Sequence, residues 1–195
     1  MTKIDAKLLK NGSDWEEYLS SMTQNKENLD KQIQIVKSKL DLHEQIKNLE
    51  AKLENKNLIV LTEDFCPDSL FNLPIFITMS ELISNLSLII YKRSENEYLN
   101  TICQNLGVMK IPALLITDTN LKIIYKWEEK PQKAYKIQSD LLEKNKSLHE
   151  SSNNTNLTLK ELMINSLENE YNKSLWNETI SEINKITNNI NQKIL

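Results

Sequence analysis

The segment from Leu58 to Ser69 constrains this chain more than any other. Its apolar run, Leu58-Ile59-Val60-Leu61, predicts a buried strand, and the amphipathic stretch from about Asp68 to Ile83 predicts a helix. Cys66 therefore falls in the turn just before the helix start. Unpaired backbone N–H groups and the positive end of the helix dipole favour a thiolate there. Because the thiolate is the nucleophilic form of cysteine, we expect any chemistry of the chain to centre on this turn.

Composition limits the classes of function open to the chain. Only two glycines and four prolines occur in 195 residues, so long helices should dominate and tight turns should be few. The formal net charge is -3, and the single arginine, Arg93, offers little for bidentate recognition of phosphate or guanine. A nucleic-acid partner is therefore not expected. The two histidines and two cysteines lack the spacing of metal ligands, so neither a metal ion nor another cofactor is expected.

The N-terminus and the hydropathy pattern indicate where in the cell the protein is expected. Residues 1–7 are polar and lack the apolar core of a signal peptide. No run approaches the roughly 20 apolar residues that a membrane-spanning helix needs. We therefore expect a cytoplasmic protein with no membrane partner, in which Cys66 and Cys103 stay reduced.

After residue 57, short apolar runs alternate with amphipathic segments. The runs predict strands at 58–61, 87–91, 113–116 and 121–127, and the segments predict helices at about 68–83, at 96–106 and from 131 onward. Gly107 is expected to cap the second of these helices in the left-handed conformation. The expected fold class is α/β with the order β-α-β-α-β-β-α, and the first two strands require a right-handed crossover.

Helical patterns flank this region on both sides. Apolar residues recur every three or four positions from Leu29 to Leu53, with a slip that predicts either a break near Asp41 or a shift of the buried face. The predicted organisation is an N-terminal helical extension at 1–56, a domain at 57–147, a linker at 148–157 and a C-terminal helical extension at 158–195. The extensions either pack on the domain or join two copies into a homodimer through these helical arms.

Two segments are distinctive: Phe65-Cys66-Pro67-Asp68-Ser69 at a helix start and Gly107-Val108-Met109-Lys110-Ile111-Pro112 before the third strand. In both segments the chain resembles the thioredoxin-like family. Pro112 follows Cys66 by 46 residues, which suits that architecture. The resemblance implies a thioredoxin-like fold over residues 57–147, with a cis proline at 112 that faces the sulfur. Beside such a proline, the backbone edge is open to an extended substrate.

The wider sequence is similar to a bacterial group of thioredoxin-like proteins. The shared segments are Tyr18 to Glu27, Leu61 to Cys66 with Asp68, Asn72-Leu73-Pro74, Trp127 with Pro131, and Ser174-Leu175-Trp176. In that group tryptophan is usual at the position of Phe65. Because the group has little assigned function, this similarity bears on the fold more than on the activity.

Ser69 stands where dithiol thioredoxins carry their second, resolving cysteine. That thiol releases the substrate by attacking the mixed disulfide, which a serine cannot do. The Ser69 hydroxyl can lower the pKa of Cys66 by stabilising its thiolate, whereas the carboxylate of Asp68 raises that pKa by repulsion, or relays a proton. Cys103 has apolar helix neighbours and is expected to be structural rather than a substitute resolving thiol.

Three functions are compatible with this site. In the first, the chain is a monothiol thiol–disulfide oxidoreductase: Cys66 forms a mixed disulfide with a protein or a low-molecular-weight thiol or disulfide, and an external thiol resolves it. The second is a catalytically silent interaction module, and the third is a peroxide sensor. The candidate catalytic residues are Cys66, Asp68 and Ser69, and the candidate substrate-binding residues are Phe65, Pro67, Ile111, Pro112 and Trp127. Trp127 either lines the groove or packs in the core.

Overall fold

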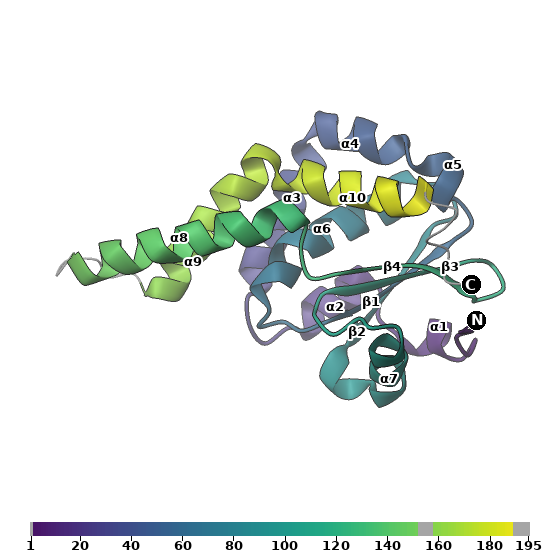
Figure 1. Cartoon of the computed structure of the whole chain (residues 1–195). Helices are drawn as coiled ribbons and strands as arrows, with labels where there is room; N and C mark the ends of the chain where they lie inside the picture. The colour runs from purple at the N-terminus through teal and green to yellow at the C-terminus, as the bar shows by residue number, and fades with distance from the viewer. Residues whose placement is uncertain (1, 152–157, 189–195) are drawn as a thin grey trace.

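The computed structural model describes residues 2–151 and 158–188 as a four-stranded sheet with helices on both faces (Figure 1). The strands are β1 (Asn57–Thr62), β2 (Ser87–Lys92), β3 (Ala113–Thr117) and β4 (Ile123–Glu128). Their order in the sheet is β2-β1-β3-β4, with β1 parallel to β2 and with β3 antiparallel to β1 and to β4. The predicted α/β class and thioredoxin-like strand and helix order are therefore confirmed.

Strand β1 is an inner strand, flanked by β2 and β3, and both of its faces are covered. Leu58 and Val60 point into the larger apolar core, whereas Ile59 and Leu61 point into a smaller core on the opposite face. All four side chains are fully buried. An uninterrupted apolar run is what a strand with two buried faces requires. The turn after β1, and hence Cys66, lies at the carboxyl edge of the two parallel strands.

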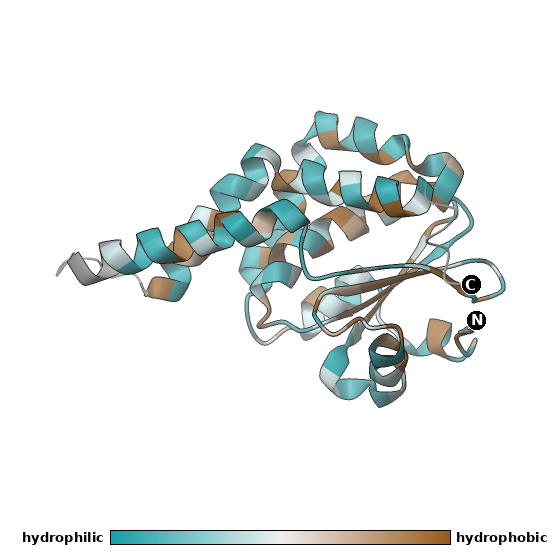
Figure 2. Cartoon of the chain, viewed as in Figure 1, coloured by the Kyte–Doolittle hydropathy of each residue, from teal (hydrophilic) through white to brown (hydrophobic). Residues whose placement is uncertain are grey.

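The helices divide between the two faces of the sheet (Figures 1 and 2). The larger core is closed by α3 (Lys26–Ser38), α4 (Leu40–Lys47), α6 (Pro67–Leu82) and α10 (Trp176–Asn188). The smaller core is closed mainly by α7 (Glu97–Asn105), with α1 (Leu8–Asn11) beside it. The remaining elements are α2 (Trp15–Ser21), α5 (Glu50–Leu53), the short turn η1 (Arg93–Glu95), α8 (Gln132–Ser151), α9 (Leu159–Glu170) and the π-helical turn η2 (Tyr171–Leu175).

The N-terminal apolar stripe packs within the chain. Leu29, Ile33 and Val36 of α3 are buried in the larger core, where α3 lies along α6. This packing occupies the face that a coiled-coil partner of α3 would need. The break between α3 and α4 falls at Lys39, two residues before the predicted position. Leu40, which belongs to the apolar pattern, is consequently 74% exposed at the first residue of α4.

The C-terminal segment returns to cover α6. Trp176 is fully buried, and its indole Nε1 donates a hydrogen bond to the Phe71 carbonyl oxygen at 2.7 Å. Between domain and terminal helix, α8 and α9 extend away from the sheet as a pair (Figure 1). Helix α8 continues to Ser151, so the start of the predicted linker at 148–157 is helical. The rest of that linker, residues 152–157, lies outside the described residues.

Candidate functional site

Cys66 occupies the N-cap of α6, as the sequence predicts. Its backbone is extended, and Pro67 follows as the first helical residue, where a missing N–H costs nothing. The Cys66 thiol donates a hydrogen bond to the Ile111 carbonyl oxygen, with Sγ and O 3.5 Å apart. The Ile111–Pro112 peptide bond is cis. The structure thus brings together the cysteine and the proline loop that the sequence separates by 46 residues.

Burial controls the ionisation of this thiol. Cys66 is 8% exposed, and loss of water raises the pKa of its thiol above the ordinary value. Ser69 opposes that rise, and the charge of Asp68 adds to it to a smaller extent. The Ser69 hydroxyl itself is buried without a hydrogen-bond partner in good geometry among the described residues. Burial therefore works against the thiolate that the helix start favours.

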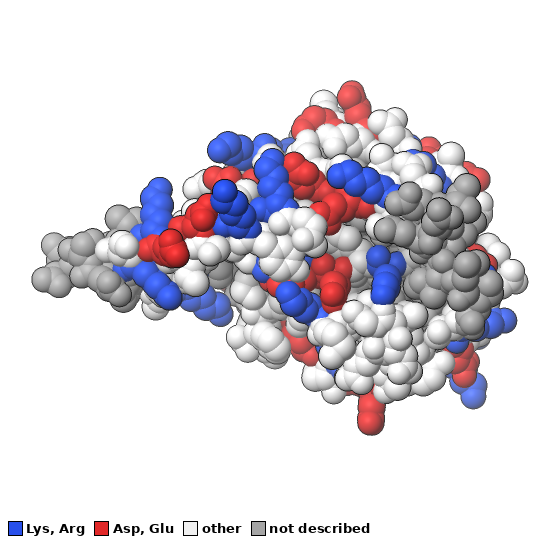
Figure 3. Space-filling view, viewed as in Figure 1, with Lys and Arg blue, Asp and Glu red and all other residues white. Residues whose placement is uncertain are grey.

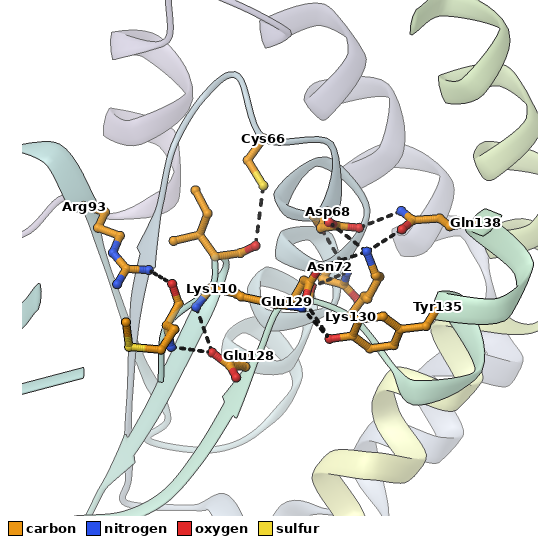
Figure 4. A network of polar contacts seen from close by, with 12 residues as sticks. Cys66, Asp68, Asn72, Arg93, Lys110, Glu128, Glu129, Lys130, Tyr135 and Gln138 are labelled. Carbon is orange, nitrogen blue, oxygen red and sulfur yellow. Dashed lines mark hydrogen bonds and ion pairs between the residues drawn. The ribbon is translucent and has the colours of Figure 1, made fainter. Parts of the chain in front are cut away.

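The carboxylate of Asp68 belongs to a polar network on the side of Cys66 away from Arg93 (Figure 4). Asp68 accepts a hydrogen bond from Gln138 Nε2 at 2.9 Å, and its Oδ2 lies 3.4 Å from Lys130 Nζ. Burial raises the pKa of Asp68, while the Lys130 ammonium and the Gln138 amide work to lower it. The carboxylate that follows Cys66 in sequence is therefore partnered from α8 and from the segment before it, although burial outweighs these partners and its pKa is raised.

Lys130 joins this carboxylate to a second one. Its ammonium, on a nearly buried side chain, lies 2.9 Å from Glu129 Oε1. Glu129 also pairs with Lys110 at 2.5 Å and accepts a hydrogen bond from the Tyr135 hydroxyl at 2.6 Å. Burial acts to raise the pKa of Glu129, but the two lysines and the tyrosine outweigh it and the pKa is lowered. The network thus holds Glu129 and Lys110 in fixed positions beside the proline loop.

Asn72 connects the network to the C-terminal extension. Its buried amide Nδ2 lies within hydrogen-bond distance of the Asp68 carbonyl at 2.8 Å and the Tyr171 hydroxyl at 3.0 Å. Its Oδ1 accepts a hydrogen bond from the Thr179 hydroxyl at 2.8 Å. Tyr171 also stacks on Phe71, with ring centroids 4.7 Å apart. The terminal helices therefore fix the first turn of α6, which carries Cys66.

The N-terminal extension fixes the other side of the same turn. Asp64 Oδ2 accepts hydrogen bonds from the Thr23 backbone N–H at 2.9 Å and from the Thr23 hydroxyl at 2.8 Å. Asn25 Nδ2 donates to the Asp64 carbonyl oxygen at 2.8 Å. These bonds, led by that from the Thr23 N–H, lower the pKa of Asp64. The segments around Thr23 and around Asp64 are thus hydrogen-bonded to each other.

An open groove of about 580 Å³ lies next to the Cys66 turn on the side of Arg93: Cys66 is not among its lining residues, but its sequence neighbour Phe65 and its hydrogen-bond partner Ile111 are. It is lined by Glu63, Phe65, Arg93, Ser94, Asn100, Met109, Lys110, Ile111 and Glu129. Arg93 Nη1 donates to the Met109 carbonyl oxygen at 2.8 Å and so holds the loop that leads to Pro112 (Figure 4). Gly107, whose φ of +70° confirms the predicted left-handed cap, directs the chain from α7 into this loop.

The predicted substrate-binding residues do not all meet at the thiol. Phe65, 52% exposed, and Ile111 line the groove, whereas Pro67 faces a separate hollow between α6, α8 and α9. Trp127 lies away from the groove: it packs edge-on against Phe76, and its Nε1 donates to Glu182 of α10 at 2.9 Å. Trp127 therefore packs under the terminal helix, which covers that face of β4.

Cys103 lies in the smaller core and is fully buried on α7. Neither cysteine forms a disulfide. Burial raises the pKa of Cys103 to about 11. Its position on the face opposite to α6 leaves it unsuited to resolve a disulfide on Cys66.

Sequence reasoning missed the charged partners of the site. Lys130, Glu129 and Gln138 come from the end of β4 and from α8, where no local pattern marks them. Arg93 had a usable signal, because it directly follows β2 and the parallel strands β1 and β2 end at the same edge. The residue after β2 therefore had to lie near the turn after β1.

The sheet order, the helix-start cysteine and the facing proline loop define a protein with the thioredoxin fold. A family model described as thioredoxin matches residues 12–146, and the chain belongs to this family. Among solved structures, a protein of unknown function from Pseudomonas aeruginosa is 20% identical with a TM-score of 0.59, covering 87% of this chain and 99% of that one. An HIV epitope-scaffold is 17% identical with a TM-score of 0.63, covering 94% and 96%. At these identities the likeness concerns the fold alone. No curated protein matches significantly.

Two kinds of feature are absent from residues 2–151 and 158–188. None of their helices combines the length and the apolar character that crossing a bilayer requires. No group of three or more His, Cys, Asp or Glu side chains in that part of the chain is arranged to hold a metal ion. On the face shown in Figure 3, acidic and basic side chains are interspersed.

Proposed function

We propose that the chain is a cytoplasmic lone-thiol oxidoreductase, in which Cys66 exchanges with disulfides of protein or low-molecular-weight partners. One observation carries this proposal: Cys66 Sγ lies 3.5 Å from the Ile111 carbonyl oxygen, beside the cis proline. An extended segment that pairs along this backbone edge would present its own sulfur to Cys66. The absence of a disulfide partner for Cys66 in the described residues makes the chemistry that of a single thiol.

The proposed reaction consists of two exchanges. The Cys66 thiolate attacks one sulfur of a partner disulfide, forms a mixed disulfide with it, and releases the other partner sulfur as a thiolate. An external thiolate then attacks the partner's sulfur in the mixed disulfide. The Cys66 thiolate leaves, and the external thiol ends in a new disulfide with the partner. The external thiol therefore supplies the electrons that a resolving cysteine would otherwise provide.

The raised pKa of Cys66 sets the rate of the first exchange. Only the thiolate attacks, and burial keeps most of the thiol protonated near neutral pH. The reaction is therefore slow at pH 7 and accelerates as the pH rises. An incoming partner must also gain access to a sulfur that is largely covered. These two features predict a selective thiol rather than a general disulfide reductase.

Trapping of the mixed disulfide tests this proposal. The Cys103→Ala protein is mixed with a cysteine-containing peptide disulfide at pH 7 and pH 9, quenched with acid and weighed by mass spectrometry. We expect one adduct per chain, formed faster at pH 9. The matched control, Cys66→Ser with Cys103 retained, should form none. A Cys103→Ala protein that forms no adduct at either pH would overturn the redox proposal.

A second function, a silent interaction module, is favoured by the burial of Cys66 and by exposed apolar residues on two helices. Leu40, on α4 of the N-terminal extension, is 74% exposed, and Leu142, on α8 of the domain, is 37% exposed. Sedimentation velocity of the native chain against Leu40→Glu and Leu142→Glu tests homodimer formation through these helices. A dimer that either charge dissociates supports the module, whereas a monomer at all concentrations counts against it. Full cellular function of a Cys66→Ser protein would favour the module over the enzyme.

A further inference from the structure

The groove beside Cys66 gathers exposed apolar side chains that the thiol chemistry does not require. Phe65 is 52% and Met109 is 60% exposed, and both line the groove. They come from different loops, one after β1 and the other after α7. A pair of exposed apolar side chains within one concave site is typical of a surface that contacts a ligand.

The same groove contains a guanidinium whose hydrogen-bonding capacity is only partly used. Arg93 Nε donates to Asn100 Oδ1 at 2.8 Å, and Nη1 donates to the Met109 carbonyl oxygen at 2.8 Å. These bonds use two of the five guanidinium N–H donors and fix the orientation of the planar group. No carboxylate in residues 2–151 and 158–188 forms an ion pair with Arg93. Arg93 is therefore both held in place and available to an external carboxylate.

The other charges that line the groove are engaged within the protein. Lys110 pairs with Glu129 at 2.5 Å. Glu63 is 8% exposed, and its Oε1 accepts a hydrogen bond from the Ser94 N–H at 2.6 Å. Glu63 would repel an anion, but Arg93 is the more exposed of the two. A ligand that enters from solvent therefore meets the guanidinium before the buried carboxylate.

We propose that this groove binds an extended peptide segment of the redox partner that carries an acidic side chain close to its cysteine. Arg93 binds the carboxylate, while Phe65 and Met109 contact an apolar side chain of the same segment. The inference rests on the proposed function, because the segment must place its cysteine at Cys66. It adds a substrate class: acidic, partly apolar segments are selected over neutral or basic ones.

Binding is measured separately from exchange. Three fluorescent peptides are compared. Each contains a leucine and has serine in place of the reacting cysteine, and they differ in carrying glutamate, glutamine or lysine at one position. Their binding to full-length Cys66→Ser protein is measured by fluorescence anisotropy. A carboxylate held by a guanidinium fork should make the glutamate peptide bind about tenfold tighter than the glutamine peptide. The lysine peptide should bind more weakly than both.

Substitutions in the groove identify the side chains that recognise the glutamate and the leucine of the peptide. Arg93→Met should abolish the preference for glutamate over glutamine, Arg93→Lys should restore part of it, and the exposed-site control Lys47→Gln should leave it unchanged. Phe65→Ser should weaken the leucine peptide severalfold and leave a glycine-substituted peptide almost unaffected. If Arg93→Met weakens the glutamate and glutamine peptides equally, Arg93 only supports the Met109 loop and the proposal fails.

The two proposals fail in distinguishable ways. Charge-selective binding without a trapped adduct keeps the groove assignment and overturns the redox function. Adduct formation without any charge preference keeps the redox function and overturns the acidic-segment proposal. Glutathione disulfide provides the last comparison: if it reacts faster than the glutamate-containing peptide disulfide and with the same dependence on Arg93, the groove selects a small thiol and the peptide assignment is wrong.

Discussion

Gln138 Nε2 donates a hydrogen bond to Asp68 Oδ1 at 2.9 Å, across 70 residues of sequence. Together with Lys130 it holds the carboxylate on the α8 side of the helix start, while the Cys66 sulfur lies toward the proline loop (Figure 4). Asp68 therefore opposes a Cys66 thiolate less than adjacency in sequence suggests. Burial, rather than repulsion, is the main cause of the raised pKa of Cys66.

The pH dependence of alkylation should report this burial. Because the pKa of Cys66 is raised above the free-thiol value of about 8.5, its iodoacetamide rate should still be rising at pH 9. The rate is measured on Cys103→Ala protein by mass spectrometry, with thiolate absorbance as a second probe. Cys66→Ser protein, which retains only Cys103 with a pKa of about 11, should react far more slowly throughout. A rate that reaches its plateau below pH 8 would contradict the burial argument.

Asp68→Asn should make Cys66 more reactive. The substitution removes a negative charge near the sulfur and leaves the Lys130 ammonium less compensated, so both effects lower the pKa of Cys66. A decrease of half a unit to one unit would raise the alkylation rate at pH 7 by about three- to tenfold. The control is Asp140→Asn on the exposed surface of α8, which should leave the rate unchanged. An unchanged or slower Asp68→Asn protein would show that Asp68 acts in another way, for instance as a proton relay.

Lys130→Met should both destabilise the fold and lower the alkylation rate of Cys66. The substitution leaves Asp68 and Glu129 nearly buried without their shared ammonium, and breaking a buried pair typically costs about 3 kcal/mol. The free energy of unfolding is measured by urea denaturation. The control, Lys133→Met, breaks a solvent-exposed pair with Glu178 and should cost less than about 1 kcal/mol.

A double substitution separates charge compensation from packing in this network. Adding Asp68→Asn to Lys130→Met removes the uncompensated charge. Part of the lost free energy of unfolding and part of the lost alkylation rate of Cys66 should therefore be recovered. If the double variant is as unstable as the sum of the two single variants, Lys130 contributes by packing on Tyr135 rather than by compensating Asp68.

The sequence predicted the parts of the fold that depend on local pattern. The apolar run from Leu58 to Leu61 indicated a strand with two buried faces, and a single glycine, Gly107, marked the end of α7. The turn that carries Cys66 could be located for the same reason, because strand, cysteine and helix start are consecutive. Leu40 shows the limit: a one-residue break after α3 rotates it into solvent, and no local pattern fixes that rotation.

The rest of the site depends on contacts between distant segments. Nothing near Trp127 indicates that Glu182 will accept its N–H, or that α10 will cover β4. Likewise, the burial of the Cys66 sulfur depends on how the proline loop and the helices close around it. The sign of its pKa shift could not be derived from the helix start alone, because burial and the helix dipole act in opposite directions.

The contact between Asp64 and Thr23 should make the stability of the fold depend on pH. The folded-state pKa of Asp64 is lowered, chiefly by the hydrogen bond from the Thr23 N–H. The ionised carboxylate therefore stabilises the fold above its unfolded pKa of about 4, and this contribution is lost as the pH falls through the lower, folded-state pKa.

Asp64→Asn should accordingly cost about 1 kcal/mol at pH 7, measured as the free energy of unfolding in urea. The difference from the native protein should shrink as the pH is lowered from 5 toward 3, because the native carboxyl then becomes protonated. Asp30→Asn, at an exposed position of α3, should show neither effect. Thr23→Val removes only the hydroxyl donor and should give a smaller loss with the same pH trend. A cost of Asp64→Asn that stays constant from pH 7 to pH 3 would show that the turn before Cys66 is not held by this charge.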